Sequence, residues 1–429
     1  LPTLPSLFNL EGRPGTYERC VQPIVAHRPG LLVVERLRSG QRACCWDIIR
    51  TIDRSDGITS DDYEELTDTS DQVFQQIRDL DPQIYPQLTL YTSKNFVQHI
   101  NQRTQSGFGP DLIVTDSETA LELYRLNLID PIKLPLKDGQ DTPQSLLDLV
   151  TAEDGALVAR PVQQFVQLAC FNKSRLPAPP GSLNELAQTS SDSTFGLAIQ
   201  LKDLYWSAQA FNATPAFQAA IKGSTVSDES RARVTAWLQW LVGSSYQQNI
   251  RFLNSQKLLR QGLIKGELDW ITCWSSNLKR LKAQMGDNLG IAALPQGPAE
   301  RRRASTKLEV WALGKNSSPL QRRKALVMLE FITKPWAQKT YSLMSSSAMP
   351  VSKKAAAIVA SKIPGGREAL NNFAQSNEKR LKPVRVKALI FRDPLKYEKV
   401  SDALLDTIYD IATPQESTKA ILRDLREEN

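Results

Sequence analysis

The sequence has few of the residues that build metal sites, and it lacks the motifs of the common catalytic folds. Its 429 residues include only two histidines, His27 and His99, which are not spaced like metal ligands. A GxGxxG fingerprint, a Walker A loop and a GxSxG nucleophile turn are all absent from the sequence. We therefore expect no metal, no cofactor and no catalytic residues.

The five cysteines are too scattered to indicate a metal site. Cys20, Cys44, Cys45, Cys170 and Cys273 form no CxxC pair, and their number is odd. This pattern argues against a zinc site and against a disulfide framework. Cys170 and Cys273 lie in apolar stretches, so we expect both to pack as small core residues.

Long apolar runs are also missing. No run approaches the roughly 18–20 residues that a membrane span requires. No positively charged segment followed by an apolar run opens the sequence at Leu1. The sequence leaves open whether a signal or a lipid anchor has been removed ahead of this residue.

Charge is more abundant, with a net value of +7. Basic residues gather at Arg301–Arg303, at Arg322–Lys324 and between Lys379 and Arg392. None of these stretches has a nucleic-acid-binding signature, and acidic residues are interleaved elsewhere. The pattern favours a solvated basic surface and no nucleic-acid partner, with contact to an anionic membrane or an acidic partner as the alternative.

The length exceeds what one hydrophobic core usually serves, so we expect two lobes. From Ser70 onward the pattern alternates between helices and strands. The predicted elements are a helix with Val73, Phe74 and Ile77 on one face, a strand at Leu88–Tyr91, a helix with Phe96, Val97 and Ile100, a strand at Asp111–Val114, and a helix capped by Asp116 or Ser117. This alternation predicts an α/β fold with a mostly parallel sheet between helices.

Three later stretches have helical periodicity, whereas the first 60 residues show only a weak pattern of helices and strands. The helical stripes are Val234, Trp237, Leu238 and Leu241; Ala325, Met328, Leu329 and Ile332 after Ser318-Pro319; and Val400, Leu404, Ile408 and Ile411. Near the start we expect a buried strand at Gly30–Glu35, a short helix at Cys44–Ile49 and a loop at Asp53–Thr69.

Four groups of short motifs occur in a consistent order along the chain. They are Gly109–Val114 with Leu128–Ile132; Phe171–Lys173 with Pro180–Leu186; Ile264–Glu267 with Trp274–Ser276 and Gly290–Pro295; and a helix at 318–336 followed by Ser345–Val351. Together they resemble the bacterial extracellular solute-binding proteins of carbohydrate ABC importers, the group that includes maltose-binding protein.

This resemblance implies a two-lobed periplasmic-binding-protein fold with a ligand cleft between the lobes. It implies an N-terminal lobe of residues 1–162 plus 306–348 and a C-terminal lobe of residues 163–305 plus 349–429. The sequence departs from the family at two places. No opening strand is recognisable in residues 1–55, which could be an extension, and Trp274 stands where many relatives have glycine.

Sugar sites combine aromatic rings with carboxylates and amides that bind hydroxyl groups. Matching to the family yields candidate ligand-binding residues of these types. They are Thr115, Asp116, Ser117, Glu118, Gln164, Asp203, Tyr205, Trp206, Trp274, Ser275, Ser276, Asn277, Glu309, Trp311 and Tyr397. Asp116 and Ser117 could equally serve as helix caps, and Trp237, Trp240, Trp270 and Trp336 are expected to be structural.

The resemblance implies a monomer outside the inner membrane, periplasmic or extracellular, that captures a sugar, an oligosaccharide or a glycoside-type osmolyte. It further implies that an ABC permease receives this ligand. Three alternatives stay open: an anionic solute on the same fold, a hydrolase or transferase on a two-lobed scaffold, and a nucleic-acid-binding regulator. The regulator would need an added helix-turn-helix, which residues 1–60 do not contain.

Overall fold

The structure is a computed structural model, and it describes most of the chain from residue 44 onward. The described residues are 44–52, 70–71, 73–79, 84–92, 95–133, 141–188, 192–298, 305–344, 348–377, 390–391 and 393–426. The strand expected at Gly30–Glu35 and the loop expected at Asp53–Thr69 lie outside them.

Two groups of three parallel strands form the centres of the molecule. In the first, β1 (Cys44–Ile52) lies between β2 (Ile84–Thr92) and β3 (Leu112–Asp116). In the second, β6 (Phe195–Ala198) lies between β7 (Ile250–Leu253) and β8 (Trp270–Trp274). The strand orders 2-1-3 and 7-6-8 are therefore the same arrangement used twice.

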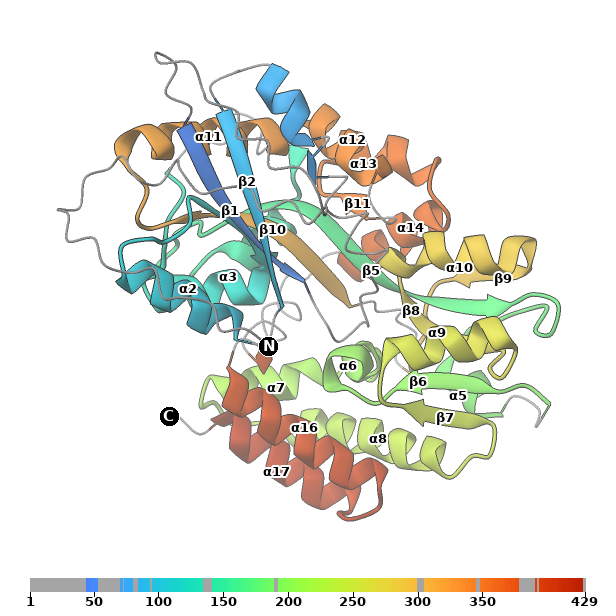
Figure 1. Cartoon of the computed structure of the whole chain (residues 1–429). Coiled ribbons are helices and arrows are strands. Elements are labelled where there is room, and N and C mark those ends of the chain that lie inside the picture. Colours follow the sequence, from blue (N-terminus) through green and yellow to red (C-terminus); the bar gives the residue numbers. More distant parts are fainter. Residues whose placement is uncertain are drawn as a thin grey trace, which may run out of the picture.

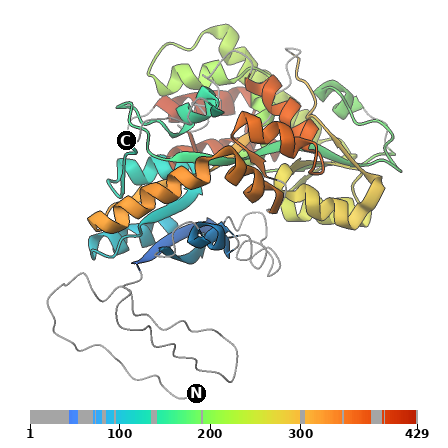
Figure 2. The ribbon, with the colours of Figure 1, turned by 90° about the horizontal axis from the view of Figure 1, so that it is seen from above.

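Long antiparallel strands join these two groups. β5 (Arg160–Asn172) pairs through its first half with β10 (Thr306–Gly314) and through its second half with β8 and β9 (Leu289–Ala292). β10 also pairs with β3 and with β4 (Ile129–Asp130), and β11 (Met349–Pro350) pairs with β5. β5, green in both views, runs through the middle of the molecule from one part to the other (Figures 1 and 2).

Helices cover both groups of strands. They are α2 (Phe96–Gln105), α3 (Ser117–Arg125), α4 (Gln144–Leu147), α5 (Leu183–Gln188), α6 (Leu201–Ala210), α7 (Thr214–Ile221), α8 (Asp228–Ser245), α9 (Gln256–Lys265), α10 (Leu278–Met285), α11 (Pro319–Thr333), α12 (Pro335–Met344), α13 (Lys353–Ala360), α14 (Gly366–Asn377), α16 (Pro394–Ile408) and α17 (Pro414–Arg426), with unlabelled helical residues at 70–71 and 73–79. The last two pack against α7 and α8, far from β1 (Figure 1).

The helices predicted from periodicity are confirmed, except that the last residue of one predicted stripe, Ile411, lies beyond the end of its helix. The stripe from Val234 to Leu241 is buried in α8, and Ser318 caps α11 through a capping box. Ile411, however, is 72% exposed. α16 ends at Ile408 and Asp410 then adopts a positive φ of 58°, so the periodic pattern continues beyond the helix itself.

The short helix predicted at Cys44–Ile49 is wrong, because these residues belong to strand β1. This strand also supplies the opening strand that could not be recognised in residues 1–55. It is flanked by a strand on each side, and the neighbouring Ile48 and Ile49 are both fully buried. A strand buried on both faces loses the alternation that identifies strands in a sequence.

The sequence predicted Cys170 and Cys273 to pack as small core residues, but the two form a disulfide. Both cysteines are fully buried, on the antiparallel neighbours β5 and β8, with 5.9 Å between their Cα atoms. They are 103 residues apart in the chain. Only the strand pairing brings them together, so no spacing rule could have indicated the bond.

Candidate functional site

The strand order predicts where a ligand site should lie. In a parallel sheet with the order 2-1-3, the loops after the central and third strands leave in opposite directions, and ligands bind at the carboxyl ends between them. These positions are the ends of β1 and β3 in the first group and of β6 and β8 in the second. The arrows of β1 and β2 point toward the part that contains α6, which follows β6 (Figure 1).

A buried carboxylate occupies this position in the second group. Asp203 lies in the first turn of α6, directly after β6, and Trp274 ends β8. The indole Nε1 of Trp274 donates to Asp203 Oδ1 at 2.8 Å, and Gln256 Nε2, at the start of α9, donates to the same oxygen at 3.1 Å. The backbone carbonyl of Asp203 accepts from Gln167 Nε2 at 2.7 Å. Residues at or just beyond the ends of all three parallel strands therefore meet at Asp203.

A cation and a tyrosine complete this group, which we call the Asp203 cluster: Gln167, Asp203, Gln256, Trp274, Lys307 and Tyr397. Lys307 Nζ of β10 lies 4.4 Å from the centre of the Trp274 ring, a cation–π contact. Burial raises the pKa of Tyr397, and the charge of Asp203 raises it further, whereas Ser401, Lys202 and Lys307 act in the opposite direction. The tyrosine hydroxyl therefore stays protonated beside the carboxylate at neutral pH.

The turn after β8 holds three more candidates. Ser275 Oγ accepts from the backbone N–H of Val166, which belongs to the crossing strand β5, at 3.1 Å. Asn277 Oδ1 accepts from Arg260 Nη1 of α9 at 2.9 Å. Ser276 lies between them and is partly exposed. This turn therefore connects the Asp203 cluster to β5, the strand that extends across both groups of parallel strands.

The candidates at the end of β3 form a helix cap. Asp116 accepts from the backbone N–H and the hydroxyl of Thr119, both at 2.8 Å, and so caps α3. Ser117 Oγ donates to Glu118 at 2.9 Å, and Thr115 is buried in β3. Asp116 lies opposite Glu309 of β10, so these residues are at the carboxyl edge of the first group.

Several aromatic candidates are packed inside the protein. Trp206 is fully buried, and Tyr205, which is also buried, lies with its ring centre 5.5 Å from that of Phe391. Trp311 of β10 is buried beside a cavity, next to strand β3 of the first group. Trp274 itself is 1% exposed. Of the predicted aromatic residues, Tyr397 is the one that is partly exposed in the described structure.

The remaining candidates, Gln164 and Glu309, lie on the crossing strands. Gln164 Nε2 approaches the carbonyl of Pro350 in β11 at 3.4 Å. Glu309 Oε2 forms a 2.6 Å ion pair with Arg50 of β1. Sequence reasoning missed Arg50, Gln256, Arg260, Lys307 and Tyr341. Gln256 had a usable signal, since it follows a serine cap directly after a short strand.

Two groups of parallel strands that share crossing strands, with polar side chains at the facing carboxyl ends, define a two-lobed binding fold. A family model described as bacterial extracellular solute-binding protein matches residues 87–365, and the chain belongs to this family. A comparison with curated protein sequences found no match. None of the helices in the described part of the chain combines the length and apolarity of a membrane-spanning segment.

Solved structures confirm the predicted two-lobed α/β fold. The maltose-bound MalE3 of T. maritima is 16% identical, with 89% of this chain and 99% of that chain covered and a TM-score of 0.68. The GacH receptor of Streptomyces glaucescens, solved unliganded and with acarbose, is 12% identical, with coverage of 88% and 97% and a TM-score of 0.70. Maltose-bound MalE of Listeria monocytogenes is 14% identical, with coverage of 89% and 97% and a TM-score of 0.66.

Proposed function

We propose that this protein binds a sugar, an oligosaccharide or a glycoside-type osmolyte between its lobes and delivers it, chemically unchanged, to the permease of an ABC importer. In this proposal the N-terminal lobe comprises residues 1–162 plus 306–348, and the C-terminal lobe comprises residues 163–305 plus 349–429. The protein would act as a monomer in the periplasm or outside the cell.

The Asp203 cluster is the observation that carries this proposal. Sugar hydroxyls both donate and accept, so a sugar site needs carboxylates, amides and cations held in fixed directions near an aromatic ring. Asp203, Gln256, Lys307 and Tyr397 supply these groups within one cluster. The Asp203 carboxylate is held by two donors, so its geometry is set before any ligand arrives, which reduces the ordering cost of binding.

The relatives support the same ligand class. The structures of MalE3 and of the Listeria MalE contain maltose, and that of the GacH receptor contains acarbose. Identities of 12–16% leave room for a different sugar in this chain.

A thermal-shift screen tests the proposal. Maltose, maltotriose, trehalose, sucrose, cellobiose and glucosylglycerol would each be added in millimolar amounts, with amino acids, phosphate and sulfate as other solute classes. We expect at least one saccharide or glucoside to raise the unfolding temperature, and calorimetry to confirm one site per chain. Stabilisation by another class alone would reject the sugar assignment.

An anionic ligand is the second candidate, because Lys307 contributes a cation to the Asp203 cluster. An affinity for phosphate or a sugar acid that falls steeply with added salt would favour it. Turnover of a bound glycoside, lost in Asp203→Asn, would instead establish a hydrolase or transferase. Delivery to a permease would be tested by whether the loaded protein stimulates ATP hydrolysis by the reconstituted importer.

A further inference from the structure

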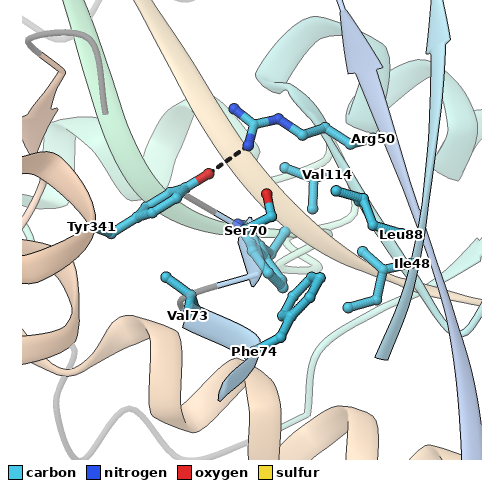
Figure 3. A pocket seen from close by; sticks show the side chains of 9 residues that line it. Ile48, Arg50, Ser70, Val73, Phe74, Leu88, Val114 and Tyr341 are labelled. Carbon is cyan, nitrogen blue, oxygen red and sulfur yellow. Dashed lines mark hydrogen bonds between the residues drawn. The ribbon is translucent and has the colours of Figure 1, made fainter. Parts of the chain in front are cut away.

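A buried ion pair joins three elements that are far apart in the sequence. Arg50 of β1 lies with Nη2 at 2.6 Å from Glu309 Oε2 of β10, and with Nη1 at 2.6 Å from the Tyr341 hydroxyl of α12. All three side chains are buried. Tyr341 directs its hydroxyl at the Arg50 guanidinium across a cavity edge (Figure 3).

The next residue of α12, Ser342, forms a hydrogen bond with β5, the other strand that joins the two groups of parallel strands. Gln163 Nε2 of β5 donates to Ser342 Oγ at 3.3 Å, and both residues are buried. Gln163 pairs with Glu309 on one side and with Pro350 of β11 on the other. Two consecutive residues of α12 therefore contact the network at the place where β5, β10 and β11 come together. We call Arg50, Gln163, Glu309, Tyr341 and Ser342 the hinge latch.

The hinge latch contains a buried ion pair between Arg50 and Glu309, so breaking it would lower the stability of the protein. Burial would lower the pKa of Arg50, but Glu309 and Tyr341 outweigh burial and hold this pKa above its ordinary value. A buried charge that loses one of its partners is strongly destabilising, so the arrangement is held as a unit. β10 is also irregular here, because its register against β5 shifts between Glu309 and Val310.

Polar groups that have no partner in the described part of the chain, and a small cavity, lie beside the latch. A cavity borders Arg50 and Tyr341 and is otherwise lined mainly by apolar side chains, including Ile48, Phe74 and Leu88 (Figure 3). Within the described residues, Glu309 Oε1 and the nearby Trp311 Nε1 are buried without a hydrogen-bond partner. A buried acceptor and a buried donor without partners among these residues show that hydrogen bonding is incomplete at this place in the core.

We propose that the hinge latch fixes the crossing strands β5 and β10 to the N-terminal lobe, next to the points where the chain passes between the lobes, and thereby sets the relative orientation of the lobes. Its members then act as positioning residues for a ligand that they do not touch. Glu309, expected from the sequence to contact ligand, acts here through Arg50. Breaking the latch loosens the crossing strands, and the lobes must then be ordered during binding, which weakens affinity. The expected change in saccharide affinity rests on the proposed function, whereas the expected change in hydrogen–deuterium exchange of the ligand-free protein does not.

Tyr341→Phe tests the latch, because it removes the hydroxyl and keeps the ring. Hydrogen–deuterium exchange on the ligand-free protein should become about tenfold faster in residues 160–166 and 306–312, and saccharide affinity should weaken about tenfold. Ser342→Ala should give smaller changes in the same segments. Glu309→Gln, which keeps the shape but leaves the Arg50 charge without its buried partner, should give larger changes in the same segments than Tyr341→Phe.

Leu238→Ala is the control, since Leu238 is fully buried in α8, in a hydrophobic cluster that includes neither the latch nor the two exchange segments. It should lower the unfolding temperature and change exchange in those segments less than Tyr341→Phe does. Equal exchange and equal affinity in Tyr341→Phe and Leu238→Ala would overturn the latch. If the wild-type protein binds no saccharide, the proposed function fails, and exchange in the ligand-free protein still decides whether the latch exists.

Discussion

Asp203 shows how a single residue can organise a site from distant segments. Its side-chain Oδ1 accepts from Trp274 and Gln256, and its backbone carbonyl accepts from Gln167. These four residues come from α6, β8, α9 and β5. The carboxylate therefore links the ends of the strands that define the site.

Replacing this carboxylate should weaken binding more than it weakens folding. Asp203→Asn keeps the shape but removes the charge, and hydrogen bonds to a charged acceptor are worth about 1.5–3 kcal/mol. We expect a loss of at least about tenfold in saccharide affinity, measured by calorimetry. The control is Glu229→Gln on the exposed face of α8, which should bind like wild type. Unchanged affinity in Asp203→Asn would remove Asp203 from the site.

Buried tyrosines should make stability depend on alkaline pH. Burial is the largest cause that raises the pKa of Tyr205 and of Tyr341 above the ordinary value of 10.0. A raised folded pKa means that the unfolded chain loses the proton first, so stability is complete below pH 10 and falls as pH rises further.

The fall should be about 1.4 kcal/mol per pH unit for each tyrosine. Urea unfolding at pH 8, 10 and 11 measures it. Tyr341→Phe should reduce the slope between pH 10 and pH 11, since one titrating group is gone. An equal slope in the two proteins would mean that the Tyr341 hydroxyl is not protected by burial.

At the scale of elements, the disulfide fastens the crossing strand β5 to β8. Cys273 directly precedes Trp274, so the bond fixes the strand end that supplies the indole of the Asp203 cluster. It also encloses β6, α6 and α9, because the two cysteines are 103 residues apart. Of the Asp203 cluster, Asp203 and Gln256 therefore lie within this covalent ring, and Trp274 directly follows it.

Removing this bond should destabilise the protein. The double substitution Cys170→Ala/Cys273→Ala should lower the free energy of unfolding by about 2–5 kcal/mol, as for other native disulfides. Urea denaturation measures the change. Alkylation of the denatured wild type should gain two labels after reduction, and an equal count with and without reductant would show that the bond is absent.

The sequence predicted those elements whose signals are local. The strand and helix pattern from Leu88 to Arg125 follows from periodicity, and Asp116 and Ser318 were recognisable as caps from their neighbours. β1 was misread because both of its faces are buried. The position of β10 between β3 and β5 was also unpredictable, since strand order depends on contacts between distant segments.

The site was predictable only in part, for the same reason. Asp203, Trp274 and Tyr397 were among the candidates matched to the family, and the structure joins the Trp274 indole to the Asp203 carboxylate. Lys307 and Arg50 were missed because a single basic residue in a strand has no periodic signal. Their importance becomes visible only through partners more than 30 residues away, Trp274 for Lys307 and Glu309 for Arg50.

At the scale of the whole molecule, a ligand held by both lobes should make the protein more compact and more stable. With the ligand at about one hundred times its Kd, the free energy of unfolding should rise by about 2.7 kcal/mol. Small-angle X-ray scattering should show a smaller radius of gyration in the presence of the same ligand. A stabilising ligand that leaves the radius unchanged would argue against closure of the lobes.

The position of β10 also determines when the chain can fold. This strand lies between β3 and β5 in space, yet it is not complete until residue 314 of 429 has been synthesised. The first three parallel strands therefore lack their antiparallel neighbour until a segment far along the chain arrives. Pairing across so long a sequence separation costs much chain entropy, so the contact between β3 and β10 should form late and slow the folding of this sheet.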